Sequence, residues 1–140
     1  FLRYSVESHQ SELVTVEKEL DFTLDYIELQ KVRFGHAFTY HIDIPEDVLG
    51  YQIPVLALQT LVENIFKHNY FTDKKPLHFT IIYSNESVKV WNKKTSVKLT
   101  ERRSTGLSNL QKRYELILQK SIVILDTEDN FSVTIPLMPV

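Results

Sequence analysis

The sequence contains no cysteine among its 140 residues. Disulfide bonds, thiolate nucleophiles and cysteine-ligated metals are therefore excluded. Glycine is scarce as well, with three residues, which leaves no room for a long glycine-rich loop. No apolar run approaches the roughly 20 residues of a transmembrane helix, and no signal peptide is recognisable. We therefore expect a cytosolic protein or the cytosolic part of a larger one.

The sequence also lacks a basic excess. Its 16 lysines and arginines against 18 aspartates and glutamates give a net charge of −2. Nucleic-acid-binding domains normally carry a basic excess or a basic stripe, so we expect no nucleic-acid partner. A hydrophobic fraction of 43% and a charged fraction of 24% are typical of one soluble domain with a single core. Because the chain opens on Phe1 without a methionine, we expect a piece of a longer protein.

Hydrophobic periodicity predicts alternating helices and strands. Thr15 as N-cap and Gly35 as C-terminal stop delimit a predicted helix over Val16–Phe34. Alternating apolar residues predict a strand over residues 38–44, and Pro54 is predicted to open a second helix. The remaining predicted elements are strands at 77–83 and 88–91 around a turn at Asn85-Glu86, a polar loop at 92–105, a helix from Leu107, and strands at 121–125 and 131–136.

This order of elements predicts an α/β fold. Hairpin strands pair antiparallel, and helices with one apolar face need a sheet to cover. The simplest solution is a two-layer α/β sandwich, with a mixed, mostly antiparallel sheet covered by helices on one face. We expect residues 16–140 to form this domain and residues 1–15 to be the end of an upstream helix with its connector.

The second predicted helix carries the clearest sign of chemistry. At helical spacing Thr60, Asn64, Lys67 and His68 share one face. The amide oxygen of Asn64 could ligate Mg²⁺, which prefers oxygen donors, and Lys67 could neutralise phosphate charge. The same spacing also fits a helix face that is merely solvated. Spacing alone leaves both interpretations open.

Residues 58–68 read L-Q-T-L-V-E-N-I-F-K-H. This segment resembles the N box of the LytS-like sensor histidine kinases, whose pattern is close to L-Q-x-L-V-E-N-A-x-K-H. Further matches follow in the family's order: Leu2-Arg3-Tyr4-Ser5, then Glu19, Tyr26, Glu28, Arg33, Phe34 and Gly35, then Ile53-Pro54, Gly106-Leu107-Ser108-Asn109-Leu110, Arg113-Tyr114 and Val133-Thr134-Ile135-Pro136-Leu137. The chain is thus similar to the catalytic domain of this family over nearly its whole length.

The resemblance implies a Bergerat (GHKL-type) ATP-binding fold. It also implies transfer of the γ-phosphoryl group of Mg-ATP to a histidine upstream of this chain. Asn64 is then the Mg²⁺ ligand, and residues 92–105 form the lid. Glu63 is a candidate catalytic residue that orients solvent or the acceptor imidazole, although a plain surface carboxylate fits equally well. The other implied nucleotide contacts are Lys67, His68, Asn92, Gly106, Leu107 and Asn109.

The family also implies a cellular setting, namely a bacterial two-component system. The partner of the full-length kinase is a response regulator, and a homodimer forms through helices upstream of this chain. Residues 1–15 are then the end of the dimerisation and phosphoacceptor helix together with its connector. The domain lies in the cytoplasm beneath an inner-membrane sensor and makes no direct membrane contact itself.

Departures from the family pattern concern activity more than fold. No N-P-H-F-like box carries an acceptor histidine, so the chain alone should not phosphorylate itself. The first glycine box, usually D-x-G-x-G, reads N-K-K-T-S from Asn92, which loses a charged acceptor and both glycines. The second glycine box, usually G-x-G-L, reads S-T-G-L from Ser104 and keeps one glycine, Gly106. A degenerate domain that serves dimerisation or protein docking is therefore an alternative. An ATP-hydrolysing relative is disfavoured because Thr60 stands where such enzymes place a carboxylate.

Overall fold

The computed structural model describes residues 13–97 and 105–140. Within these ranges it contains three helices longer than one turn and a principal sheet of five strands. In chain order the elements are β1 (Leu13–Thr15), α2 (Val16–Phe34), η1 (Gly35–Ala37), β2 (Phe38–Asp43), η2 (Glu46–Val48), β3 (Gln52–Pro54), α3 (Ala57–His68), β4 (Asn69–Tyr70), β5 (Leu77–Ser84), β6 (Ser87–Lys93), β7 (Ser96–Val97), α4 (Thr105–Leu118), β8 (Val123–Asp126) and β9 (Asn130–Pro136).

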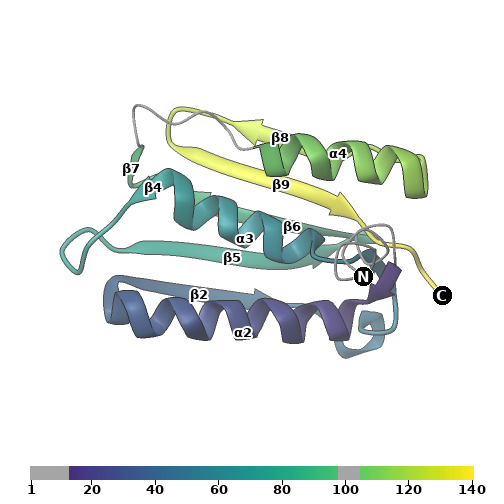
Figure 1. Cartoon of the computed structure of the whole chain (residues 1–140), viewed down its shortest axis with the longest axis horizontal. Helices are drawn as coiled ribbons and strands as arrows, with labels where there is room; N and C mark the ends of the chain where they lie inside the picture. The colour runs from purple at the N-terminus through teal and green to yellow at the C-terminus, as the bar shows by residue number, and fades with distance from the viewer. Residues whose placement is uncertain (1–12, 98–104) are drawn as a thin grey trace, which may run out of the picture.

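The principal sheet has the strand order β2-β5-β6-β9-β8. Strands β2 and β5 are parallel, and the three other neighbouring pairs are antiparallel. Helices α2, α3 and α4 lie side by side over one face of this sheet, with α3 in the middle (Figure 1). The prediction of a two-layer sandwich with a mixed, mostly antiparallel sheet and helices on one face is confirmed.

Helix α2 has the bounds that its sequence signals predict. The Thr15 hydroxyl accepts a hydrogen bond from the Lys18 N–H at 3.1 Å, which satisfies one of the free donors of the first turn. At the other end Gly35 has φ 58°, a left-handed conformation that glycine adopts without the steric cost of a Cβ atom. The predicted turn at Asn85-Glu86 is also present, with positive φ at both residues.

Two predictions about the elements are wrong. Pro54 does not open a helix; it ends β3, which pairs antiparallel with β1, and α3 starts only at Ala57. Residues 92–105 are not a continuous loop either, because Asn92 and Lys93 extend β6, and β7 pairs with β4. The expected helix end at residues 1–9 and the lid residues 98–104 lie outside the described residues.

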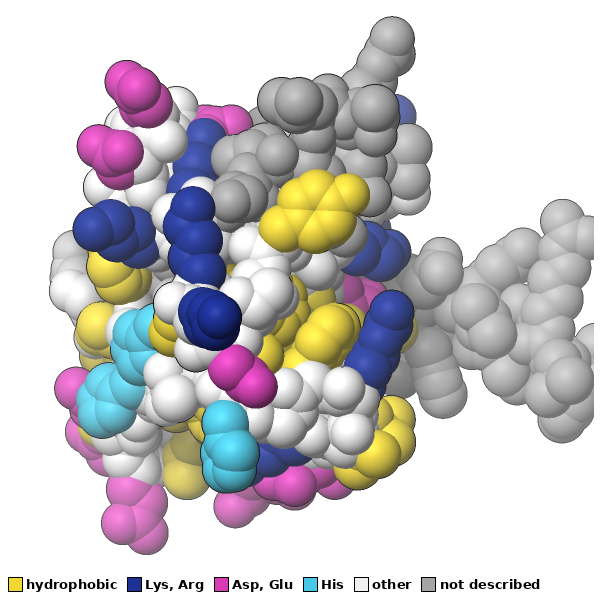
Figure 2. Space-filling view, turned by 90° about the vertical axis from the view of Figure 1, so that its left-hand side faces the viewer, with side chains coloured by type: hydrophobic (Ala, Val, Ile, Leu, Met, Phe, Trp, Pro, Cys, Tyr) yellow, Lys and Arg dark blue, Asp and Glu magenta, His cyan; other side chains and the backbone are white. Residues whose placement is uncertain are grey.

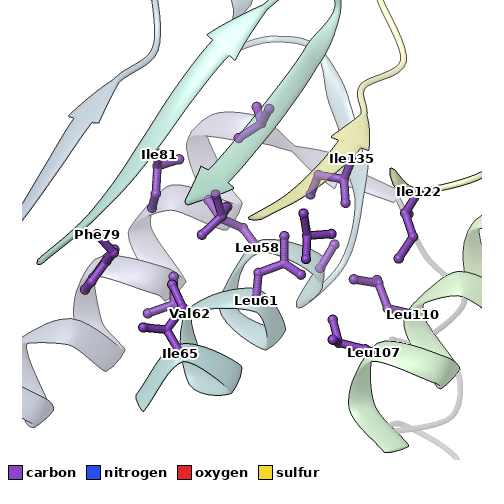
Figure 3. Packing of buried hydrophobic residues seen from close by; sticks show 14 of the residues in the cluster. Leu58, Leu61, Val62, Ile65, Phe79, Ile81, Leu107, Leu110, Ile122 and Ile135 are labelled. Atoms are coloured by element: carbon purple, nitrogen blue, oxygen red, sulfur yellow. The ribbon is translucent and has the colours of Figure 1, made fainter. Parts of the chain in front are cut away.

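The core lies between the sheet and the middle helix. In Figure 3 the α3 side chains of Leu58, Leu61, Val62 and Ile65 face those of the sheet and of α4. The sheet and α4 contribute Phe79, Ile81, Ile135, Leu107 and Leu110, all of them buried. Since α3 is packed against the sheet and between two helices, functional side chains on it are held rigidly.

Candidate functional site

The polar residues of α3 lie in different environments. Asn64 is 2% exposed and His68 is 7% exposed, whereas Lys67 is exposed and Glu63 is half-buried. A merely solvated face is therefore excluded for Asn64 and His68. Buried amide and imidazole groups need polar partners, which can be protein groups or a ligand.

Asn92 lies at the end of β6 and is 1% exposed. Its side-chain nitrogen donates to the carbonyl of Lys93 at 3.2 Å, which fixes the orientation of the amide. Its Oδ1 atom is buried and has no hydrogen-bond partner among the described residues. Because a buried acceptor without a donor costs about 1–3 kcal/mol, a ligand N–H that reaches this oxygen gains a favourable contact. The amino group of adenine is such a donor.

The segment that follows Asn92 is tied to the end of α3. The Thr95 N–H donates to Oδ1 of Asn69 at 3.2 Å, and the Thr95 hydroxyl donates to the carbonyl of Tyr70. The side-chain nitrogen of Asn69 in turn donates to the carbonyl of Ile65, at 2.9 Å. The strands β4 and β7 meet at the same end of the sandwich as the C-terminus of α3 (Figure 1). The β4–β7 pairing thus fixes the segment that follows Asn92.

The surface at this end is partly basic. Figure 2 faces it and shows lysine or arginine side chains with hydrophobic side chains between them. On the sheet face opposite the helices, Lys75, Lys93, His78 and Trp91 help to line a hollow of about 370 Å³. Lys94 lines the same hollow and forms an ion pair with Asp126 at 2.6 Å. Positive charge on this surface raises the local concentration of anionic ligands.

A separate hollow of about 470 Å³ lies between α3 and α4. Thr60 lines it from α3, and Gly106, Asn109 and Arg113 line it from α4. The structure thus brings the predicted residues Gly106 and Asn109 together with Thr60, while Asn64, His68 and Asn92 do not line this hollow. Leu107 belongs to the hydrophobic core, so only its backbone is suited to contact a phosphate.

Sequence reasoning matched Glu19 of α2 to the family pattern but gave no role to it, although it is the most deeply buried charged group of the described residues, at 0% exposed. Its carboxylate accepts hydrogen bonds from three backbone N–H groups at the start of α3: those of Leu56 at 2.8 Å, Leu58 at 3.0 Å and Gln59 at 3.2 Å. The sequence signal for this contact is the lack of an N-cap residue before α3. The residues before α3 offer no serine, threonine, aspartate or asparagine as N-cap, so the cap had to come from elsewhere.

Arg113 of α4 completes this cluster. Its guanidinium donates a hydrogen bond to the carbonyl of Val55, just before α3. Burial is the main influence on Glu19 and raises the pKa of its carboxyl from 4.5 to about 6, although the three N–H donors and the Arg113 charge oppose the shift. Glu19 of α2, Arg113 of α4 and the start of α3 thus form one cluster that links the three helices.

The comparisons with known proteins agree with this architecture. The family model "Histidine kinase" matches residues 1–38. Sensor histidine kinase YpdA of Escherichia coli is 41% identical over 68 residues, which is 49% of this chain and 12% of YpdA. Sensor protein LytS of Staphylococcus saprophyticus is 30% identical over 88 residues, 63% of this chain and 14% of LytS.

The chain is therefore related to the LytS-like sensor histidine kinases. The solved catalytic domain of histidine kinase ThkA superposes with a TM-score of 0.58 at 15% identity, and the alignment covers 92% of this chain and 98% of that domain. This likeness establishes the fold of a histidine kinase catalytic domain. The chain spans only about an eighth of the length of its LytS-like relatives. Among the described residues, no helix is long and apolar enough to cross a membrane.

The raised pKa of Glu19 predicts a pH-dependent stability for this LytS-like domain. A carboxyl whose pKa is higher in the folded than in the unfolded state stabilises the fold in its protonated form. Its contribution, about 2 kcal/mol for this shift, is fully present below pH 4.5 and is lost as the pH rises through about 6.

Urea unfolding at pH 4.5 and pH 7 measures this contribution. In Glu19→Gln, the change in unfolding free energy between the two pH values should differ from that of the wild type by about 2 kcal/mol. Other carboxyls titrate in both proteins and cancel in this comparison. An identical pH dependence in the variant would show that Glu19 does not titrate in this range.

Proposed function

We propose that this chain is the ATP-binding catalytic domain of a two-component sensor histidine kinase, and that it passes the γ-phosphoryl group of Mg-ATP to a histidine upstream of residue 1. The observation that carries the proposal is the buried Oδ1 of Asn92, an acceptor without a donor among the described residues, at the end of the sandwich where α3 also ends. An adenine amino group would satisfy it. Asparagine replaces the family's aspartate here, so this contact is weaker than a charge-assisted one.

Each further candidate residue has a role that fits its placement. The amide oxygen of Asn64 is the proposed Mg²⁺ ligand, because this cation takes oxygen donors that it shares with phosphates. Bound Mg²⁺ neutralises charge on the transferred phosphoryl group. Lys67, exposed at the last turn of α3, and His68 lie next to Asn64 along the helix and supply positive charge or hydrogen bonds to phosphate oxygens. Glu63 is proposed to orient the acceptor.

The start of α4 is the proposed phosphate contact. Gly106 is the second residue of α4, and the first turn of a helix leaves backbone N–H groups without partners inside the helix, while the dipole there favours negative charge. Without a Cβ atom, Gly106 allows a phosphate to approach the backbone closely. Leu107 contributes its N–H group, and Asn109, exposed one turn into the helix, contributes its side chain.

The setting of the domain is proposed from its relatives. We expect a homodimer through helices upstream of this chain, a response regulator as the partner of the whole kinase, and a place at the cytoplasmic face of a bacterial membrane. Residues 1–15 then connect the phosphoacceptor helix to the domain. Neither nucleic acid nor lipid is an expected partner of the domain itself.

A second candidate function rests on the β4–β7 ladder. The ladder, held by Thr95, Asn69 and Tyr70, replaces glycines that leave the family's backbone free to pass close to the base. A domain with this segment fixed could keep the sandwich and serve only dimerisation or protein docking. This alternative predicts no nucleotide binding.

Calorimetric titration with ATP, with and without Mg²⁺, decides between the two functions. We expect magnesium-dependent binding with a dissociation constant between about 1 μM and 1 mM. We also expect weaker binding of GTP, because the guanine carbonyl cannot donate to Oδ1 of Asn92. An absence of heat and of thermal stabilisation at millimolar nucleotide would favour the docking module. Equal affinity for ATP and GTP would remove Asn92 from the base site.

A further inference from the structure

Helix α3 starts in a conformation that its own sequence does not support. The residue before it, Leu56, has φ 65°, the left-handed region that side chains with a Cβ atom rarely adopt. Leu56 offers no side-chain acceptor to the free N–H groups of the first turn. Ala57 and Leu58 are buried, so water cannot satisfy these groups. The start of α3 therefore depends on another element.

That element is α2, through Glu19. One carboxylate oxygen accepts from Leu56, and the other accepts from Leu58 and Gln59, 37 to 40 residues away in the chain. The two oxygens thus fix both the strained residue and the first turn. Because a helix is stiff over two turns, holding its first turn also sets the position of Asn64.

Arg113 ties the same point to α4. Its guanidinium donates to the carbonyl of Val55, and its charge is opposite to that of Glu19. Arg113 also lines the hollow between α3 and α4 together with Gly106 and Asn109. A shift of α3 is thereby coupled to α4.

The entering chain is attached to this point as well. Strand β1 pairs with β3, which ends directly before Val55. The N–H groups of Val16 and Glu17 donate to the carbonyls of Tyr51 at 2.8 Å and Leu49 at 3.0 Å. The segment that leads into the domain is therefore hydrogen-bonded to the chain directly before the Glu19 contact.

We propose that Glu19, together with Arg113, is a positioning residue for the nucleotide site: it holds α3 in place between α2 and α4 and so sets the place of Asn64 relative to the start of α4. The proposal rests on the proposed function for its ligand. It predicts that loss of Glu19 weakens nucleotide binding beyond what a loss of stability explains.

The test compares Glu19→Gln with Thr23→Val, one turn further along α2. Thr23 is equally buried, but among the described residues its hydroxyl bonds only to the carbonyl of Glu19 in the same helix. At a temperature where both variants are folded by circular dichroism, Glu19→Gln should bind Mg-ATP about tenfold more weakly than wild type, and Thr23→Val within about twofold. Equal affinities of the two variants would overturn the proposal.

Amide hydrogen exchange provides a readout that needs no nucleotide. In Glu19→Gln, protection should fall at Leu58 and Gln59 and also at Asn64 and at the start of α4. A loss confined to residues 56–59 would make Glu19 a local cap only. If wild type fails to bind Mg-ATP, the proposed function fails, and this exchange pattern still decides the role of Glu19. If Glu19→Gln does not fold, Arg113→Lys, which keeps the charge but not the planar fork, takes its place with the same two outcomes.

Discussion

Replacing Asn64 by alanine is expected to weaken magnesium-dependent ATP binding at least about 100-fold, equivalent to about 2.7 kcal/mol. Asn64 is 2% exposed on the middle helix, so its amide is held in place and loses little freedom when it binds a cation. Alanine removes the oxygen donor that the proposed Mg²⁺ site requires. Calorimetric titration with and without Mg²⁺ measures the loss.

The matched control is Gln59→Ala, which removes another side-chain amide from the same helix. The Gln59 side chain lies on the α2 side, where it lines a hollow with Phe22 and Tyr26. We expect its affinity for Mg-ATP to stay within about threefold of wild type. Thermal unfolding without nucleotide shows whether the variants remain folded. Unchanged binding by Asn64→Ala would remove Asn64 from the site and leave the fold untouched.

Phe66→Ala is expected to cause the largest loss of stability, about 4 kcal/mol in the free energy of unfolding. Phe66 lies at the centre of an aromatic cluster that joins α2, α3, β2 and β5. Its ring centroid is within 6.0 Å of five others, those of Tyr26, Phe34, Phe38, Phe71 and Phe79. Alanine leaves a cavity between elements that are rigid in themselves and cannot collapse fully.

Urea unfolding measures this effect, with two comparisons. Phe66→Leu retains much of the volume and should lose about 1–2 kcal/mol. Leu116→Ala removes an apolar side chain of α4 that is 83% exposed, and should change stability by less than about 0.5 kcal/mol. A loss below about 1 kcal/mol for Phe66→Ala would mean that the ring cluster contributes little.

Local signals predicted much of the fold. Thr15 and Gly35 placed both ends of α2 because a cap and a left-handed stop act on the nearest turn of their own helix. Alternation placed β2 because this strand has one buried face, and turn signals placed the β5–β6 and β8–β9 hairpins. The prediction that Pro54 opens a helix was wrong because a proline suits both the first turn of a helix and the end of a short strand. Only the pairing with β1 decides between the two.

The candidate site was less accessible to local reasoning. Spacing placed Asn64 and Lys67 near one another on α3, but it could not show that neighbouring elements cover Asn64 and leave Lys67 exposed. Asn92 and Gly106 were selected only through the resemblance to a family, since each is an ordinary residue by composition. The Glu19 contact joins residues far apart in sequence and follows from tertiary packing alone.

The parallel pairing of β2 with β5 has a consequence for the order of folding. The β5–β6 and β8–β9 hairpins close through short turns, and such hairpins form within about 1–10 μs. Joining β2 to β5 requires closure of the whole segment 44–76, which contains α3, and long-range closure is slow. We therefore expect α2 and β2 to dock last, onto a preformed β5 edge. Helix α2, which follows the entering strand β1, is then among the last elements to assemble. Until it docks, the start of α3 lacks the Glu19 carboxylate as its cap.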